Sequence, residues 1–167
     1  YKRHMYYGLG LYRMAESKKG PYASEHELLW QLRDIREQCP NTGYCFYNSS
    51  SFDKIRPAFK DSLKYSHAKY PAFVPPMLWL DSVAPSAPNL KMELSASGVT
   101  LKWEQNNPQK EPLRYVVYRF VNNEPINLDR NDKIISIQRG TDYNDPDAKK
   151  FRQTAYVVTA LDRLWNE

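Results

Sequence analysis

The stretch LRYVVYRF, residues 113–120, decides the fold class of the second half of the chain. β-Branched and aromatic residues dominate it, which favours a strand over a helix. Alternate side chains of a strand point to opposite faces, which here are Tyr115, Val117 and Arg119 against Val116, Tyr118 and Phe120. Both sets are largely apolar. We therefore expect a strand that packs on both sides.

Further segments of the second half have the same character. They alternate apolar and polar residues or are rich in β-branched ones, and they are residues 90–94, 99–103, 133–139 and 155–161. Polar turn sequence separates them at 106–112 and 140–146. Short strands at regular spacing predict an all-β half built as a β-sandwich.

The first half has a different pattern, strand–helix–strand–helix. The expected strands are residues 8–12 and 44–47, and the expected helices are 24–38 and 57–67. Ser24 and Glu27 have the spacing of a capping box at the start of the first helix. A connection of this length between strands predicts parallel pairing. Two such units are too few for a buried α/β core, so a larger α/β domain is expected.

Prolines mark the expected boundary between the halves. Five of them fall close together: Pro71, Pro75, Pro76, Pro85 and Pro88. Proline fixes its own φ and disfavours a helical conformation in the residue before it. We therefore expect residues 70–89 to be extended and to pack along the first domain. The expected domains are residues 1–84 and 85–167.

Composition excludes several classes of protein. Of the 167 residues, 41% are hydrophobic and 26% are charged, which is typical of a globular chain. The apolar runs are far shorter than the roughly 20 residues of a membrane-spanning helix, so no such span is expected. The net charge is +5, but the basic residues do not cluster on one element, and we expect no nucleic-acid partner. Tyrosine is unevenly placed, with 9 of 13 before Ala84.

The second half resembles a fibronectin type III domain. The residues that carry the resemblance are Pro85, Pro88, Leu101-x-Trp103, Tyr115-x-x-Tyr118, Thr141-x-Tyr143-x-Asp145 and Tyr156-x-Val158-x-Ala160. The resemblance implies that Trp103 is a core residue and that Tyr156 is the tyrosine-corner residue. It also implies a last strand after Trp165-Asn166-Glu167, where this sequence stops.

The first half resembles the end of the barrel in bacterial glycosyl-hydrolase-10-like proteins. The matching motifs are Gly8-Leu9-Gly10-Leu11-Tyr12-Arg13, Glu27-x-x-x-Gln31-x-x-x-x-Arg36, Gly43-Tyr44-Cys45-Phe46-Tyr47-Asn48-Ser49 and Tyr70-Pro71-Ala72-Phe73-Val74-Pro75-Pro76-Met77-x-Trp79. The resemblance implies an α/β fold in residues 1–84, namely the last two βα units of a TIM-type (β/α)8 barrel. A fibronectin type III-like β-sandwich follows in residues 85–167. The implied parent protein is a glycoside hydrolase.

Sugar-binding residues are expected where barrel strands end. They are Tyr12, Arg13 and Glu16 after the first strand, and Tyr47, Asn48, Ser49 and Phe52 after the second. Aromatic faces suit stacking on sugar rings, and Asn, Ser and Arg suit hydroxyl recognition. The alternative is that Tyr12 and Tyr47 are packing residues and that 48–51 is an ordinary polar loop.

Catalytic residues are not identifiable. Glycoside hydrolysis needs two carboxylates roughly 5 to 10 Å apart, and Glu16 and Asp53 are the acids near the expected strand ends. We expect the catalytic pair upstream of Tyr1 and no hydrolase activity in this chain alone. The competing hypothesis is a non-catalytic carbohydrate-binding or spacer module.

The remaining expectations concern cofactors, location and assembly. Neither the two cysteines nor the three histidines have metal-ligand spacing, and no phosphate-binding glycine loop occurs, so no metal and no cofactor are expected. Tyr1 is not an initiator methionine, and we expect the C-terminal part of a longer protein. By analogy that protein is extracytoplasmic (periplasmic, cell-surface or secreted). Open strands in the first half would favour self-association.

Overall fold

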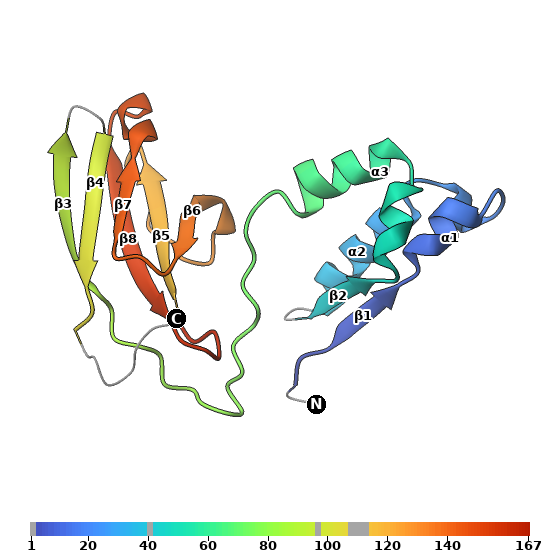
Figure 1. Cartoon of the computed structure of the whole chain (residues 1–167), viewed down its shortest axis with the longest axis horizontal. Helices are drawn as coiled ribbons and strands as arrows, with labels where there is room; N and C mark the ends of the chain where they lie inside the picture. Colours follow the sequence, from blue (N-terminus) through green and yellow to red (C-terminus); the bar gives the residue numbers. More distant parts are fainter. Residues whose placement is uncertain (1–2, 40–41, 96–97, 107–113) are drawn as a thin grey trace. The chain divides into compact units, whose positions relative to one another are not determined.

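The computed structural model describes residues 3–39, 42–95, 98–106 and 114–167. The chain divides into two compact units, Tyr1–Lys69 and Tyr70–Glu167. The unit boundary therefore lies fifteen residues before the one that the prolines suggest. Each unit has its own hydrophobic core and is described by itself (Figure 1).

The first unit is built on two short parallel strands. β1 (Tyr6–Leu9) pairs with β2 (Gly43–Phe46), in a register that places Tyr6 opposite Gly43 and Leu9 opposite Phe46. Its helices are α1 (Leu11–Glu16), α2 (Glu27–Gln38) and α3 (Pro57–Ser62), and a π-helical turn, Leu63–His67, continues α3. Short 3-10 turns lie at Pro21–Ala23 and Ser49–Asp53.

The core of the first unit lies on one face of this strand pair. Its fully buried side chains come from the three helices: Leu11, Leu28, Leu32 and Phe59. Leu9, Tyr44 and Phe46 pack against them from the strands. On the other face, Tyr6 is 54% exposed and Cys45 is also exposed. The strand pair is therefore covered on one side.

The expected TIM-type barrel fold of residues 1–84 is wrong. β1 and β2 form a two-stranded sheet, and the other six described strands lie in two antiparallel sheets, with three α-helices in the described residues. The physical reason is burial. A barrel strand needs both faces covered, whereas Tyr6 and Cys45 leave one face of this pair in solvent. An apolar run as short as 44–47 does not by itself distinguish the two cases.

Some boundaries in the first unit also differ from expectation. The first strand ends at Leu9, because Leu11 and Tyr12 already belong to α1. The capping box is absent: helix α2 begins at Glu27, and Ser24 Oγ accepts a bond from the His26 amide (3.2 Å) before the helix starts. The helix expected at 57–67 is confirmed as α3 and its π-helical continuation.

The second unit contains two three-stranded antiparallel sheets. One has the order β3-β4-β7, with β3 Asn89–Ser95, β4 Gly98–Glu104 and β7 Asp142–Asp145. The other has the order β6-β5-β8, with β5 Arg114–Val121, β6 Ile134–Gln138 and β8 Thr154–Leu161. The turn expected at 106–112 lies outside the described residues beyond Asn106.

Strand β5 is the packing centre of this unit. Tyr115 and Val117 face a core that includes Leu101 and Trp103 of the other sheet. Val116, Tyr118 and Phe120 face the opposite side, where Phe73, Leu128 and Trp165 cover them. The strand at 113–120 and its two packed faces are confirmed for the described residues 114–120.

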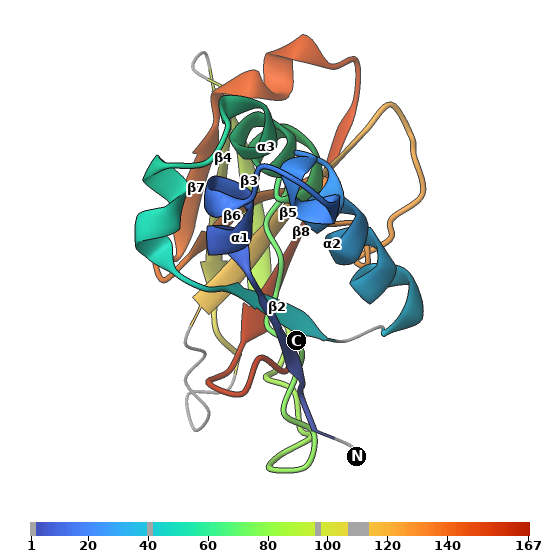
Figure 2. The ribbon, with the colours of Figure 1, turned by 90° about the vertical axis from the view of Figure 1, so that its right-hand side faces the viewer.

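The proline-rich segment belongs to the second unit. Residues 70–88 contain neither helix nor strand (Figure 2). The Met77 amide donates to the Leu164 carbonyl (3.0 Å), and the Asn166 side-chain amide donates to the Asp81 carbonyl (3.1 Å). The extended form is as expected, and these two bonds lie within the second unit, whereas packing along the first domain stays a prediction.

Strand β7 is a strand where a turn is expected. Its residues, Asp142 to Asp145, are polar and typical of turns, yet they pair with β4. Its last residue, Asp145, is 1% exposed. The Asp145 carboxylate accepts two bonds from Arg119 Nη1 (2.8 and 2.9 Å) and one from the Tyr156 hydroxyl (2.7 Å). A buried charge is tolerated only when it is paired and hydrogen-bonded in this way.

Phe59 tests the core of the first unit. Its side chain is fully buried and its ring lies 6.0 Å from the Phe46 ring. We expect Phe59→Ala to lower the free energy of unfolding of this unit by about 3–5 kcal/mol, because it leaves a cavity. Urea titration followed by far-UV circular dichroism measures the change. Tyr65→Ala is the matched control, since Tyr65 is 63% exposed, and an equal loss in both variants would contradict this core.

Tyr156 gives the second unit a pH dependence. Burial, and then the bond to Asp145, raise the pKa of Tyr156 from 10.0 to about 12. The stability that this phenol contributes is complete below pH 10 and is lost as the pH rises towards 12. The free energy of unfolding of Tyr156→Phe should therefore change less between pH 10 and pH 12 than the free energy of unfolding of the wild type. Urea titrations followed by tryptophan fluorescence measure this free energy at each pH, with Tyr65→Phe as the control. An equal dependence on pH in the wild type and in Tyr156→Phe would contradict the prediction.

Candidate functional site

The ends of β1 and β2 bring two separate segments of the chain together. Because the strands are parallel, the segments that follow them leave from the same edge (Figure 1). The Tyr47 amide donates to the Leu9 carbonyl (2.9 Å), and the Tyr12 amide donates to the Tyr47 carbonyl (3.3 Å). The backbone ladder thus continues past the strands and joins the start of α1 to the residue after β2.

Two tyrosine side chains meet at this edge. The rings of Tyr12 and Tyr47 are 5.9 Å apart and nearly perpendicular (83°). Tyr47 is 67% exposed, whereas Tyr12 is half-buried. An edge-to-face pair of this kind holds each ring in a defined orientation. It leaves most of the Tyr47 ring available to a ligand.

Arg13 lies beside this pair on α1. Its Nε donates to the Tyr12 hydroxyl (3.4 Å), and its guanidinium carbon is 5.2 Å from the centre of the Tyr22 ring. The Tyr12 hydroxyl, and then Tyr22, raise the pKa of the Arg13 guanidinium, which therefore stays cationic. Glu16, one turn later, ends α1 with an exposed side chain.

The second expected segment contributes less to the site than the sequence suggests. Asn48 Oδ1 caps the turn that follows it, accepting bonds from the Ser51 amide (3.2 Å), the Ser51 hydroxyl (2.9 Å) and the Ser50 hydroxyl (2.8 Å). The ring of Phe52 packs on Phe46 at 5.5 Å and belongs to the core. Ser49 is exposed. Of the seven expected site residues, the described contacts join Tyr12, Arg13 and Tyr47.

Tyr22 and Gln31 are neighbours of the site that the sequence reasoning did not select. Gln31 Nε2 donates to the Tyr22 hydroxyl (3.3 Å) and to Glu27 Oε1 (2.7 Å). This chain of bonds fixes the phenol over which Arg13 lies. The available signal was the four-residue spacing of Glu27 and Gln31, which places both on one face of a helix.

The acids near the site are exposed in the described residues. Glu16 and Asp53, the acids near the strand ends, both have exposed side chains. The described residues also contain no group of three or more His, Cys, Asp or Glu that could hold a metal ion. What these residues can do chemically is stack on a ring, donate hydrogen bonds and present a positive charge.

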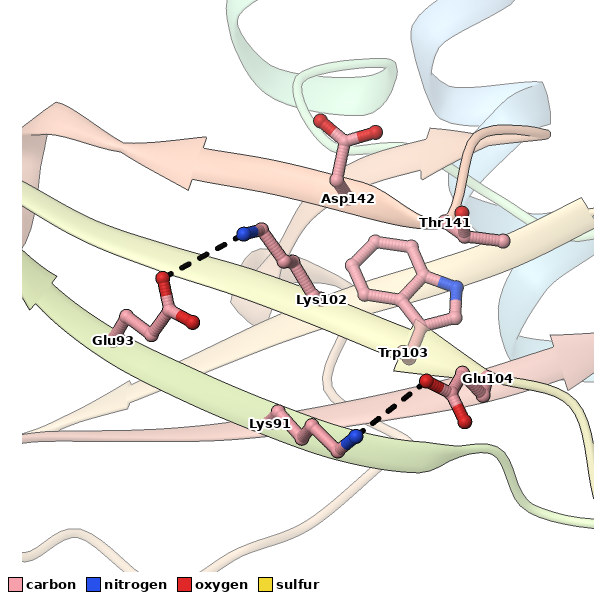
Figure 3. Close-up of a pocket in the computed structure, with 7 residues that line it drawn as sticks. All are labelled: Lys91, Glu93, Lys102, Trp103, Glu104, Thr141 and Asp142. Atoms are coloured by element: carbon pink, nitrogen blue, oxygen red, sulfur yellow. Dashed lines mark hydrogen bonds and ion pairs between the residues drawn. The ribbon is translucent and has the colours of Figure 1, made fainter.

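The second unit has a groove on the outer face of β3, β4 and β7 (Figure 3). It has a volume of about 550 Å³ and is crossed by two ion pairs, Lys91–Glu104 (3.5 Å) and Lys102–Glu93 (3.6 Å). These side chains are 59–75% exposed, so the pairs add little stability. Trp103 lines the groove but is 3% exposed, which leaves no ring face for stacking.

No helix in the described part of the chain is long and apolar enough to cross a membrane.

Comparison with known proteins shows a distant similarity to a glycosyl hydrolase. The chain is 28% identical over 172 residues to the glycosyl hydrolase YngK of Bacillus subtilis (strain 168). The aligned region includes 98% of this chain but 32% of that protein, so the chain spans about a third of the relative's length. No family model matches the chain. No solved structure matches it either. The chain is thus distantly related to a glycosyl hydrolase across nearly its whole length.

Proposed function

We propose that this chain is a carbohydrate-contacting part of a glycoside-hydrolase-related protein, and that sugar binds at the edge where β1 and β2 end. The observation that carries the proposal is the Tyr12–Tyr47 pair, with Tyr47 67% exposed beside Arg13. The distant relationship to a glycosyl hydrolase supports the same ligand class.

The chemistry of the site suits a sugar. An aromatic ring offers an apolar face to the C–H groups of a pyranose, and a rigid ring costs little conformational entropy on binding. The exposed Arg13 guanidinium and Ser49 hydroxyl can donate to sugar hydroxyls from opposite segments. Glu16 can accept from such hydroxyls at the end of α1. Asn48 and Phe52 support the site indirectly. Asn48 caps the turn that follows β2, and Phe52 packs on Phe46 in the core.

In this proposal the chain contributes to a sugar-binding cleft and does not hydrolyse the glycosidic bond by itself. Two carboxylates must flank that bond, one of them kept protonated by its surroundings. Exposed acids such as Glu16 and Asp53 lack an environment of that kind.

The second unit is proposed to be a fibronectin type III-like spacer or interaction module. Supporting features are its two antiparallel sheets, the buried Trp103 and the hydroxyl of Tyr156 bonded within the unit. The groove on β3, β4 and β7 makes a second carbohydrate surface the alternative. We further propose an extracytoplasmic location, by analogy, and self-association of the first unit through its open strands β1 and β2.

Tyr47→Ala tests the binding site. We expect binding of oligosaccharides to weaken at least about tenfold, because the exposed stacking face is lost, while thermal unfolding stays unchanged. A glycan array on the wild-type chain selects the ligand, and calorimetric titration measures the affinity. Tyr65→Ala is the control, since it removes an equally exposed tyrosine from the same unit. Retained affinity in Tyr47→Ala, together with a loss in Lys102→Ala, would move the site to the groove on β3, β4 and β7.

Hydrolysis by the chain is expected to be absent. Incubation with aryl glycosides and with the glycans that bind on the array should release no product above the buffer blank. Chromatography of reducing ends, with a commercial glycosidase as positive control, measures this. Turnover that disappears in Glu16→Gln or Asp53→Asn would show that the chain carries its own catalytic acid.

A further inference from the structure

We propose that the sugar bound at the end of β1 and β2 carries a carboxylate, and that Arg13 recognises this group. The inference rests on the proposed function, because it specifies the ligand of the same site. It concerns the charge of the ligand, which the stacking tyrosines do not determine.

The contacts of Arg13 are aromatic. Its guanidinium contacts the Tyr12 hydroxyl (3.4 Å) and Tyr22, whose ring centre lies 5.2 Å away and whose hydroxyl is also a hydrogen-bond partner. Within the described residues, no carboxylate oxygen lies within 4.0 Å of the Arg13 guanidinium. Arg119 shows the contrast, because its Nη1 donates to both carboxylate oxygens of the buried Asp145.

The phenols hold the Arg13 guanidinium without neutralising it. The bond from Nε to Tyr12 fixes one edge of the planar group, and Tyr22 lies against its face. Tyr22 is itself fixed by the Gln31 amide (3.3 Å), which also binds the nearby Glu27 carboxylate (2.7 Å). A guanidinium has five N–H donors, more than the two phenol oxygens can occupy, so donors remain for a ligand. A planar fork of this kind matches a carboxylate with two parallel hydrogen bonds.

The surrounding charge favours an anion as well. Residues 11–20 contain Arg13, Lys18 and Lys19 against Glu16. An excess of exposed positive charge in the segment that carries Arg13 attracts an anionic ligand at low salt. Exposed charges of this kind raise the rate of association, whereas the direct Arg13 contact sets the selectivity.

Tyr12 couples the two parts of the site. Its ring contacts the Tyr47 ring at 5.9 Å, and its hydroxyl accepts the bond from Arg13. The stacking surface and the cation are therefore adjacent through a single side chain. A sugar ring on Tyr47 would direct a ring carboxylate, as in a uronic acid, towards Arg13.

The experiment compares matched acidic and neutral ligands on the 167-residue chain. The probes are oligouronides, each paired with the same oligosaccharide after methyl esterification of its carboxylates. Calorimetric titrations at 50 and 300 mM NaCl measure both members of each pair. The wild type should bind the acidic member at least about tenfold more tightly, since a charge-assisted pair is worth more than a neutral one.

Variants separate this inference from the proposed function. Arg13→Gln should weaken binding of the acidic member at least about tenfold more than binding of its ester, so that the preference is lost, and Arg13→Lys should restore part of the preference. Lys18→Gln, a charge-matched control, should keep the preference and change the salt dependence. Equal weakening of acid and ester in Arg13→Gln, or a wild type that prefers the ester or binds neither member, would overturn the inference. Unchanged binding of both members in Tyr47→Ala would instead overturn the proposed site.

Discussion

The candidate site depends on two backbone hydrogen bonds. The Tyr47 amide reaches the Leu9 carbonyl, and the Tyr12 amide reaches the Tyr47 carbonyl, one step past the last paired residues of β1 and β2. Without them, the start of α1 and the loop after β2 would leave the sheet independently. With them, two tyrosines from segments 35 residues apart meet as an edge-to-face pair. The main-chain hydrogen bonds thus determine which side chains meet at this edge.

The alternation of apolar residues in the sequence predicted those elements in which apolar side chains determine the buried face. Strand β5 alternates between two apolar sets, and both are buried. Strand β7 was missed because Asp142 to Asp145 lack such a set, and pairing with β4 and the buried Asp145 make it a strand. The barrel prediction was wrong for a related reason. An apolar run of four residues is compatible with one covered face or two, and the exposed Tyr6 shows that one face is open.

For the candidate site, residue type and position indicated three side chains that the structure brings together, and they did not indicate the local contacts of two others. Tyr12, Arg13 and Tyr47 meet because they follow parallel strands, which sequence order alone implies. Phe52 is an aromatic residue of the kind that can stack on a sugar, but its ring packs on Phe46. Asn48 is a residue of the kind that can bind sugar hydroxyls, but its side-chain oxygen accepts hydrogen bonds within the turn that it caps. These assignments depend on local packing and hydrogen bonds, which a pattern of residue types does not contain.

Binding a sugar and cleaving it place different demands on a protein. Binding needs an exposed ring face and donors that are held in place, and hydrogen bonds at a strand end are sufficient for that. Cleavage needs two carboxylates in different environments, one of them shielded from solvent to raise its pKa. In the described residues, the shielded carboxylate is Asp145, and Arg119 and Tyr156 already occupy it in the second unit. Under the proposed function, recognition at the end of β1 and β2 does not require hydrolysis by the described residues, so binding and turnover measurements test the two properties separately.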